Sequence, residues 1–290
     1  MNPATYEQNA RHTRLGVVVA ALVVLVAFPA SAQAATAPVP LGTAKSFVVL
    51  AGAGVTNTGK TTLNGDLGTF PTTSITGLST LTLNGTNHAG DAVTQGAKKD
   101  LTTAYTTAAG AGPTKAIPVE LGGKTLQPGV YSGGALGLTG TLTLDGGNNP
   151  DAVFIFKAAS TLITASASRV TLVNVNPCNV FWQVTSSATL GTGSRFVGTI
   201  MALTDIHLTT GATLSGRALA RNGAVTLQAN TISLPVCSQV TRVPSGGVRT
   251  GDGSTSGNGN GVRGLWAGAL LLAAVGGISV AARRRRRANV

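Results

Sequence analysis

The fold is decided by a repeat in residues 187–233, which read SATLGTGSRFVGTIMALTDIHLTTGATLSGRALARNGAVTLQANTIS. The period is close to 18 residues: Thr192, Thr210 and Gln228 occupy equivalent positions, and an apolar residue follows each of them at a constant distance. Such a period of β-branched, small and glycine residues is typical of a β-solenoid with stacked coils. Equivalent positions then form columns at the strand spacing of roughly 4.8 Å, and the threonines make a regular row of hydroxyl and methyl groups.

Short strand-like runs continue on both sides of this repeat. They are rich in Thr, Val, Leu and Ile and are separated by Gly, Asn and Ser. Residues 141–144 and 225–227 alternate between polar and apolar side chains, which favours apolar residues inside the coil and threonines outside. Residues 35–237 are long enough for one sizeable core, so we expect a single all-β domain there.

One segment has a helical pattern instead. Between Asp91 and Ala109 the apolar positions recur on one helix face at Val93, Ala97, Leu101, Tyr105 and Ala108. Asp91 is a good N-cap, and Gly110 and Pro113 mark the exit. The sequence therefore predicts one long helix that covers an apolar face of the solenoid.

Both ends predict targeting segments. Residues 1–34 are typical of a signal peptide, with Arg11 and Arg14 before an apolar run and a small-residue cleavage site at 32–34. Residues 238–263 predict a Gly/Ser/Asn-rich linker, and the uncharged residues 264–282 predict a C-terminal transmembrane helix. The arginines of residues 283–290 favour a basic cytoplasmic tail. We expect an exported domain anchored at the extracellular face of the cell membrane; a buried helix or a processed tail is the alternative for 264–282.

The charge of the chain does not indicate a nucleic-acid partner. The net charge is +12, but residues 35–237 hold eleven Lys and Arg against seven Asp and Glu, which leaves +4. No basic patch is interleaved with aromatic residues. Residues 54–61 match the phosphate-binding P-loop pattern, yet turn and strand residues follow where that loop requires a helix. We therefore predict neither nucleic-acid nor nucleotide binding.

Candidate catalytic and metal-binding residues are few. His88 is expected in the turn before the helix and His207 on the outer side of a strand, both solvated and without metal-spaced Cys or carboxylate neighbours. The carboxylates mostly adjoin Gly, Asn or Pro, where turn roles suffice, and the serines lack an organised His/Asp partner. The sequence predicts no enzyme, cofactor or metal; a polysaccharide-cleaving enzyme would need paired carboxylates in a groove.

The cysteine pairing stays open at this point. Cys178 and Cys237 both lie in the exported part, where a disulfide is permitted. The 18-residue register, however, places Cys237 about three coils away and on another face. A bridge requires close Cα atoms, so the chain after Leu234 would have to fold back; two buried thiols are the alternative.

Taken together, several stretches resemble the DUF3494-type microbial ice-binding proteins. They are residues 55–59 with 65–68, 88–91 with 100–105, 126–131 with 152–156, and 178–184 through 216–227. The resemblance extends from about Leu41 to Ile232. It implies a right-handed discontinuous β-helix of triangular section flanked by an α-helix, with one flat face that binds ice through the pattern Thr-[Ala/Gly]-x-[Thr/Asn].

This resemblance selects the candidate site residues. The pattern is complete at residues 210–213, and a second outward set follows inward-pointing residues. The expected ice-binding residues are Thr164, Thr189, Thr192, Thr210, Thr213, Thr226, Asn230 and Thr231. Arg195, Gln228 and His207 depart from the pattern. We expect a monomeric antifreeze or ice-adhesion protein; the alternative is a cell-surface adhesin or glycan-binding β-solenoid, which would need exposed aromatic side chains.

Overall fold

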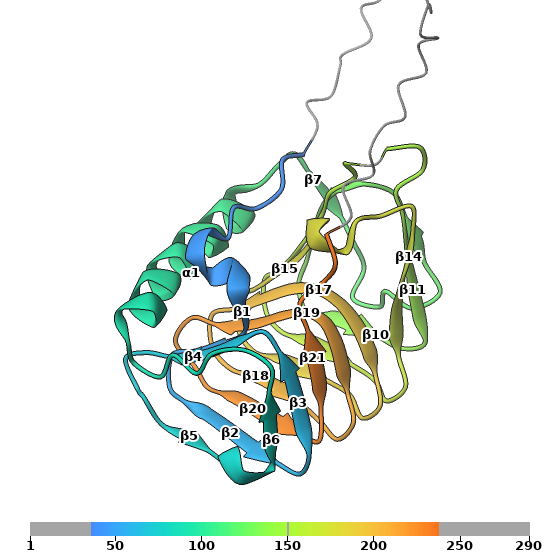
Figure 1. Ribbon diagram of the computed structural model, residues 1–290. Coiled ribbons are helices and arrows are strands. Elements are labelled where there is room, and N and C mark those ends of the chain that lie inside the picture. Colours follow the sequence, from blue (N-terminus) through green and yellow to red (C-terminus); the bar gives the residue numbers. More distant parts are fainter. Residues whose placement is uncertain (1–35, 150, 238–290) are drawn as a thin grey trace, which may run out of the picture. The chain divides into compact units, whose positions relative to one another are not determined.

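The computed structural model describes residues 36–149 and 151–237, which form stacked coils of parallel strands (Figure 1). One side of the stack is a seven-stranded sheet. Its strands, in spatial order, are β10 (Leu136–Leu138), β13 (Leu162–Thr164), β16 (Ala188–Leu190), β18 (Ile206–Leu208), β20 (Val225–Gln228), β2 (Val55–Thr58) and β5 (Ile75–Thr76).

The other strands belong to a 14-stranded sheet that covers two further sides. The helix-side face contains β7 (Thr114–Ala116), β9 (Gly129–Gly133), β12 (Phe154–Ala158), β15 (Val180–Val184), β1 (Phe47–Ala51) and β4 (Asp66–Thr69). The third face contains β8 (Thr125–Leu126), β11 (Thr141–Asp145), β14 (Arg169–Val173), β21 (Thr231–Ser233), β3 (Thr61–Asn64) and β6 (Leu81–Leu83). Two long strands, β17 (Arg195–Ala202) and β19 (Thr213–Ala220), contribute to both faces.

The bend between these two faces lies at a glycine. β17 pairs with β14 at Arg195 but with β15 from Thr199 onward. Between these points Gly198 has φ +112, a backbone conformation that side-chain-bearing residues rarely adopt. Gly216 is its partner on β19, where an added Cβ would lie 1.9 Å from the Gly198 carbonyl oxygen. Glycine is therefore required at both positions for the coils to turn and stack.

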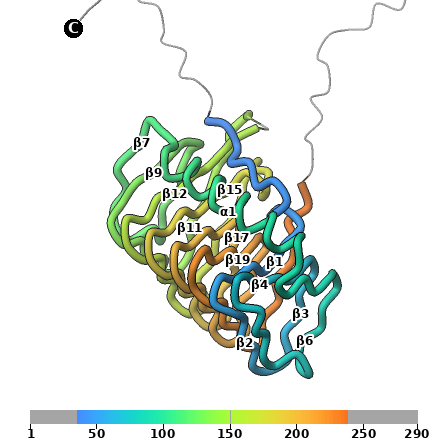
Figure 2. Tube along the Cα trace, turned by 90° about the vertical axis from the view of Figure 1, so that its left-hand side faces the viewer, coloured from blue at the N-terminus to red at the C-terminus, as the bar shows by residue number. Residues whose placement is uncertain are grey.

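The stack is discontinuous in sequence. The N-terminal strands β1, β2 and β3 pair with the C-terminal strands β19, β20 and β21. The chain then returns through the helix α1 (Ala92–Gly110) to β7 at the other end of the stack (Figure 2). The discontinuous solenoid flanked by one helix, expected from the resemblance, is thus observed.

The helix α1 begins and ends close to the predicted positions. Asp91 caps it, because its carboxylate accepts a hydrogen bond from the Thr94 N–H at 2.8 Å. The buried face comprises Thr94, Ala97, Leu101, Ala104, Tyr105 and Ala108. It packs on apolar side chains of the helix-side face and of the chain before it, including Phe47, Ile155 and Leu219. The prediction that Val93 lies on this face is wrong, because its side chain is 47% exposed, whereas its neighbour Thr94 is fully buried.

Inside the coils, the core includes a column of aromatic rings. Tyr131, Phe156, Trp182 and Phe196 follow one another with ring centroids 5.5, 4.0 and 4.8 Å apart. The Trp182 Nε1–H donates to the Val197 carbonyl at 3.0 Å, so its polar atom is satisfied. Full burial of each such side chain contributes roughly 1.5–3 kcal/mol, which makes this column a major part of the core.

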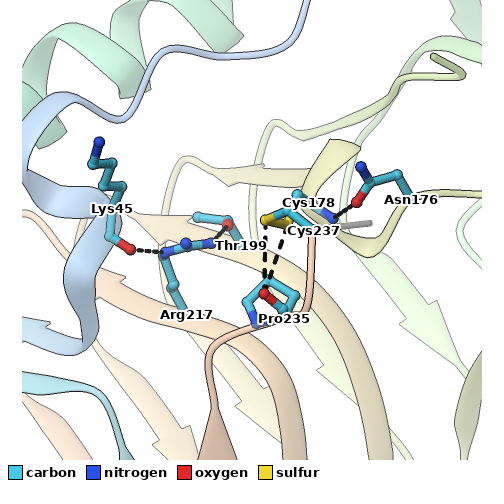
Figure 3. Close-up of a disulfide and its surroundings, with 7 residues drawn as sticks. All are labelled: Lys45, Asn176, Cys178, Thr199, Arg217, Pro235 and Cys237. Atoms are coloured by element: carbon cyan, nitrogen blue, oxygen red, sulfur yellow. Dashed lines mark hydrogen bonds between the residues drawn. A yellow bond between two sulfur atoms is a disulfide. The ribbon is translucent and has the colours of Figure 1, made fainter. Parts of the chain in front are cut away.

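The two cysteines form a disulfide, with Cα atoms 5.5 Å apart (Figure 3). Cys178 lies in the short 3-10 helix η3 (Pro177–Asn179), which projects from the stack before β15. After β21 the chain folds back, and the Leu234 N–H donates to the Asn64 carbonyl at 3.2 Å. This return brings Cys237 to Cys178 despite the three coils that separate them in the simple repeat register. Two further 3-10 helices, η1 (Gly42–Ser46) and η2 (Leu78–Thr80), complete the described elements.

One part of the expected fold class needs correction. Within residues 36–149 and 151–237 there is no helix both long and apolar enough to cross a membrane. The predicted transmembrane segment 264–282 lies outside the described residues, as do the signal peptide, the linker and the basic tail. The C-terminal transmembrane helix is therefore removed from the fold class, which is a β-solenoid with one flanking helix.

Candidate functional site

The seven-stranded sheet carries one outward residue from each strand in a straight column. The register connects Thr189 to His207, His207 to Thr226, and Thr226 to Thr56. The full set, from β10 to β5, is Gly137, Ile163, Thr189, His207, Thr226, Thr56 and Thr76. In β16, β18 and β20 the residues on either side are buried, so the column members point outward. We call this set the sheet column.

A second column lies where the chain leaves this sheet. There the backbone turns through a left-handed residue in five coils, namely Ala167, Gly193, Gly211, Ala229 and Gly59, with φ of 58, 64, 69, 50 and 74. The turns stack by backbone hydrogen bonds: the Gly193 N–H donates to the Thr210 carbonyl at 2.9 Å and the Gly211 N–H to the Gln228 carbonyl at 3.0 Å. The residues just before the left-handed positions form the corner column: Ser166, Thr192, Thr210, Gln228 and Thr58.

This geometry explains the Thr-[Ala/Gly]-x-[Thr/Asn] pattern. The residue at its second position has a left-handed backbone conformation. Glycine adopts this conformation without strain, whereas it costs other residues free energy. Its third position points into the coil, since Ser194, Ala212 and Asn230 are at most 1% exposed. Its fourth position begins the next strand, on the third face. The pattern therefore describes the turn at one edge of the seven-stranded sheet.

The predicted site residues fall into four places. Thr189 and Thr226 lie in the sheet column, and Thr192 and Thr210 in the corner column. Thr213 and Thr231 lie around the corner, in register on the third face. Thr164 and Asn230 are buried, with 3% and 1% of their surface exposed, and neither can contact an external surface.

The register explains why Thr164 is buried. Thr164 pairs with Leu138, a buried residue of β10, and so belongs to an inward column. Its Oγ1 accepts a hydrogen bond from the Gly191 N–H at 2.9 Å. The residue equivalent to Thr192 is Ser166, because the Ala167 N–H donates to the Thr192 carbonyl.

Asn230 has a structural role inside the corner. Its Nδ2 donates to the carbonyls of Thr209 and Ala212 at 2.8 and 3.0 Å. Its Oδ1 accepts from the Gln228 N–H at 2.6 Å. The side chain thus satisfies backbone groups of two successive turns and fixes the corner in place.

Three outward threonines were missed by the sequence interpretation: Thr56, Thr58 and Thr76. They extend both columns onto β2 and β5. No period in the sequence connects residue 56 to residue 226. The only local signal is the alternation of exposed and buried residues in β2 itself.

Hydrogen bonds hold several hydroxyls of the corner. The Thr192 and Thr209 hydroxyls lie 3.3 Å apart, and Thr209 Oγ1 also donates to the Leu190 carbonyl at 2.8 Å. Thr210 Oγ1 donates to Gln228 Oε1 at 3.2 Å. Because these side chains are held before any ligand arrives, less rotamer freedom is lost on binding.

The two columns carry no Asp, Glu, Lys or Arg along the described strands of the sheet. Nearby acidic groups are bound to the backbone: Asp205 Oδ1 accepts from the Ala224 N–H at 2.8 Å, and Glu120 accepts from Gly122 and Thr139. Burial alone would raise the pKa of Glu120, but the hydrogen bonds from Thr139 and Gly122 outweigh it, and the pKa is lowered. The surface is therefore polar and hydroxyl-rich, with His207 as its single titratable side chain among the described positions.

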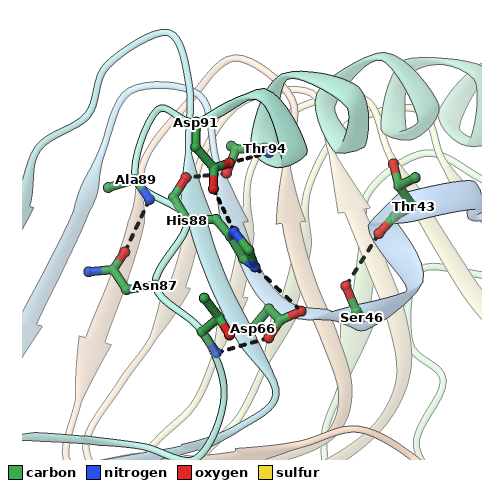
Figure 4. Close-up of polar contacts among 9 residues, drawn as sticks. Thr43, Ser46, Asp66, Asn87, His88, Ala89, Asp91 and Thr94 are labelled. Atoms are coloured by element: carbon green, nitrogen blue, oxygen red, sulfur yellow. Dashed lines mark hydrogen bonds and ion pairs between the residues drawn. The ribbon is translucent and has the colours of Figure 1, made fainter.

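A separate polar cluster surrounds His88 (Figure 4). His88 Nδ1 lies 2.7 Å from Asp91 Oδ2, and Nε2 lies 3.9 Å from Asp66 Oδ2. The prediction that His88 is solvated is wrong, because its side chain is only 16% exposed and also packs against the Phe47 ring. The Thr94 hydroxyl donates to the His88 carbonyl, so the cluster links the start of α1 to the coil beneath. In the described part of the chain, no three His, Cys, Asp or Glu side chains gather where they could hold a metal ion.

Comparison with known proteins gives a consistent result. The model of the family described as "Ice-binding-like" matches residues 49–233. An ice-binding protein of Nostoc sp. (strain HG1) is 46% identical over 219 residues, covering 74% of this chain and 81% of that protein. One from Flavobacterium frigoris (strain PS1) is 35% identical over 217 residues, covering 68% and 76%.

Solved structures agree in fold. The crystal structure of an ice-binding protein from an Antarctic biological consortium superposes with a TM-score of 0.69 at 46% identity, covering 70% of this chain and 94% of that one. The ice-binding protein of the Antarctic ascomycete Antarctomyces psychrotrophicus gives a TM-score of 0.65 at 42% identity, covering 68% and 98%. With a stacked, threonine-bearing solenoid and a family match over most of its described residues, the chain belongs to the ice-binding-like family.

Proposed function

We propose that this protein adsorbs to ice through the sheet column and the corner column, together called the ice face. The observation that carries the proposal is the register of the outward threonines, which places Thr189, Thr226 and Thr56 in the sheet column beside Thr192, Thr210 and Thr58 in the corner column. The relatives named above are ice-binding proteins, which supports the same function here.

The physical mechanism follows from regularity and stiffness. Equivalent hydroxyls repeat at the strand spacing of roughly 4.8 Å, which is close to a repeat in the oxygen lattice of ice. Each contact through water is weak, but a rigid array of methyl and hydroxyl groups holds many neighbouring waters without an ordering cost at the moment of binding. Adsorbed molecules force ice to grow as curved fronts between them, which lowers the local freezing point and slows recrystallisation.

The third face is less suited to this role. Its first outward column contains Thr213 and Thr231, but Arg195 and Arg169 follow in the same register. A charged side chain retains a strong hydration shell and is costly to desolvate. We therefore propose Thr213 and Thr231 as flanking residues of the ice face rather than as its centre.

The protein is proposed to act as a monomer outside the cell. One chain supplies both columns, so no second copy is needed to complete the ice face. The Cys178–Cys237 disulfide supports an oxidising compartment, and the signal-like residues 1–34 point the same way.

Ice-affinity partitioning of the purified protein tests the assignment of the face. Thr210→Tyr and Thr226→Tyr should each lower the ice-bound fraction several-fold, because the bulky ring would hold the neighbouring threonines away from the flat ice surface. Thr171→Tyr is the matched control, since Thr171 is an exposed strand threonine on the third face. Equal partitioning of all three variants and the wild type would place the ice contact elsewhere.

The glycan-binding alternative has no support from aromatic side chains in the described residues. Stacking on sugar rings needs exposed rings, but Phe154, Phe156, Phe181 and Trp182 are at most 1% exposed. Adsorption to ice remains the function that the geometry favours.

A further inference from the structure

Arg169 and Arg195 form an adjacent pair on the third face. They are Cα partners on the neighbouring strands β14 and β17, and both are exposed. The two guanidinium groups therefore project to the same side from strands roughly 4.8 Å apart. Like charges directly opposite one another on a sheet are destabilising, and threonine occupies the equivalent position at Thr141 and Thr213 without that cost.

Nothing in the described part of the protein neutralises this pair. Neither guanidinium has a hydrogen-bond or ion-pair partner there. Of the other two described arginines, Arg217 donates to the Lys45 carbonyl at 2.8 Å, and Arg221 lies 4.9 Å from the centroid of the Tyr105 ring, although its Nε has no hydrogen-bond partner. Six carboxylates that could have formed ion pairs with these arginines accept hydrogen bonds from backbone N–H groups instead. They are Asp66, Asp91, Asp100, Glu120, Asp145 and Asp205. The pair thus stays available to an external anion.

We propose that this pair, with the surrounding threonines, binds an acidic polysaccharide. Each guanidinium fork can hold a carboxylate through two parallel hydrogen bonds. Two forks on neighbouring coils suit a polymer that presents a carboxylate on successive sugars, and the hydroxyls of Thr141, Thr171 and Thr213 suit its hydroxyl groups. β14 and β11 lie on the far side of the stack from α1 (Figure 1).

A nucleic acid fits this surface less well. Its single strands are held by stacking of bases on aromatic side chains, and the outward positions of β11, β14 and β17 carry none. The binding surface lies on the third face, next to the corner column of the ice face, and the two surfaces share only the flanking residue Thr213. The protein would thereby hold an anionic extracellular matrix on one face and ice on another.

Binding to alginate, a polyuronate, tests the proposal by calorimetry at low and high salt. Wild-type protein should bind alginate at low salt, and its affinity should fall as salt screens the charges. It should show no binding to the neutral polymer dextran. The variant R169Q/R195Q should bind alginate at least about tenfold more weakly. The control K45Q/K99Q removes the same charge from two exposed residues near α1 and should lose less than about twofold.

Three results would overturn the proposal: no alginate binding by the wild type, equal losses in the two double variants, or equally tight binding of duplex DNA. Ice-affinity partitioning of R169Q/R195Q is measured in parallel and should match the wild type. A wild-type protein that binds alginate but not ice would defeat the proposed ice face and leave the acidic-polysaccharide surface intact.

Discussion

At the scale of single residues, the left-handed corner positions decide how well the turns can stack. Gly193 and Gly211 adopt this conformation freely, whereas Ala167 and Ala229 adopt it with φ of 58 and 50. A Cβ in the left-handed region costs about 1–2 kcal/mol. The two alanines therefore store strain at the edge of the ice face, next to Ser166 and Gln228.

Replacement of Ala229 by glycine should stabilise the protein. Relief of about 1–2 kcal/mol of strain is partly offset by about 0.4–1 kcal/mol from the greater freedom of glycine in the unfolded chain. The net gain is between about 0 and 1.6 kcal/mol, and each kcal/mol raises Tm by roughly 2–4 °C, which calorimetry measures. Ala212→Gly is the control, because Ala212 is fully buried in the same type of turn without a positive φ, and it should destabilise.

His207 interrupts the sheet column between Thr189 and Thr226. No charged group faces it from β16 or β20, and Asp205 in the preceding turn is bound to the Ala224 N–H. Replacement of His207 by threonine should raise the ice-bound fraction, because it restores a hydroxyl and a methyl group to the sheet column.

Ice-affinity partitioning of His207→Thr measures this effect. His207→Gln is the control, because it removes the imidazole without restoring a threonine, and it should give a smaller gain. Identical ice-bound fractions for wild type and His207→Thr would show that the column tolerates the imidazole.

At the scale of elements, the three faces have different tasks. The helix-side face is covered by α1, the seven-stranded sheet presents the threonine columns, and the third face mixes threonines with Arg169 and Arg195. The helix depends on its first turn, where Asp91 accepts the Thr94 N–H and contacts His88. The pKa of Asp91 is lowered, mainly by the hydrogen bond from the Thr94 N–H and next by the hydrogen bond with the His88 side chain.

The pH dependence of stability should therefore include Asp91. A carboxylate with a lowered pKa in the folded state contributes stability that is present above its unfolded pKa of about 3.9 and is lost as pH falls through the folded pKa. Asp91→Ala should lower Tm at neutral pH, and the difference from wild type should shrink as the solution is acidified below about pH 4. Asp91→Asn retains a capping oxygen and should keep most of the neutral-pH Tm; a constant difference for Asp91→Ala down to pH 2 would contradict the role of ionised Asp91.

At the scale of the whole molecule, the two ends of the domain meet in the same coils. β1 to β3 pair with β19 to β21, so the N-terminal strands continue the ice face that the C-terminal strands begin. The disulfide then closes a chain separation of 59 residues beside this junction. Long-range closure of this kind restricts the unfolded chain more than it adds contacts to the folded one.

Removal of the disulfide should lower the free energy of unfolding by about 4 kcal/mol on the chain-entropy estimate. Urea unfolding of the double Cys178→Ser and Cys237→Ser variant measures this loss. Neither cysteine belongs to the ice face, so ice-affinity partitioning near 0 °C should remain at the wild-type level. A variant that stays fully folded yet no longer partitions into ice would show that the disulfide shapes the ice face itself.

The sequence alone was sufficient for the solenoid class, the position of the helix and the family. An 18-residue repeat, alternating strands and a capped amphipathic segment are local patterns, and each is encoded within one or two coils. The outward direction of Thr189 and Thr226 follows from the same alternation. These features needed no knowledge of which strands pair.

Only the tertiary structure decided which column each threonine joins. Leu136, Leu162 and Ala188 are aligned although they lie 26 residues apart, so the 18-residue period does not apply at Thr164, which is buried as a result. Thr56 reaches the ice face through pairing of β2 with β20, and Cys237 reaches Cys178 through the return of the chain after β21. The physical reason is that backbone hydrogen bonds between strands set the register, and insertions between coils change the sequence distance without changing that register.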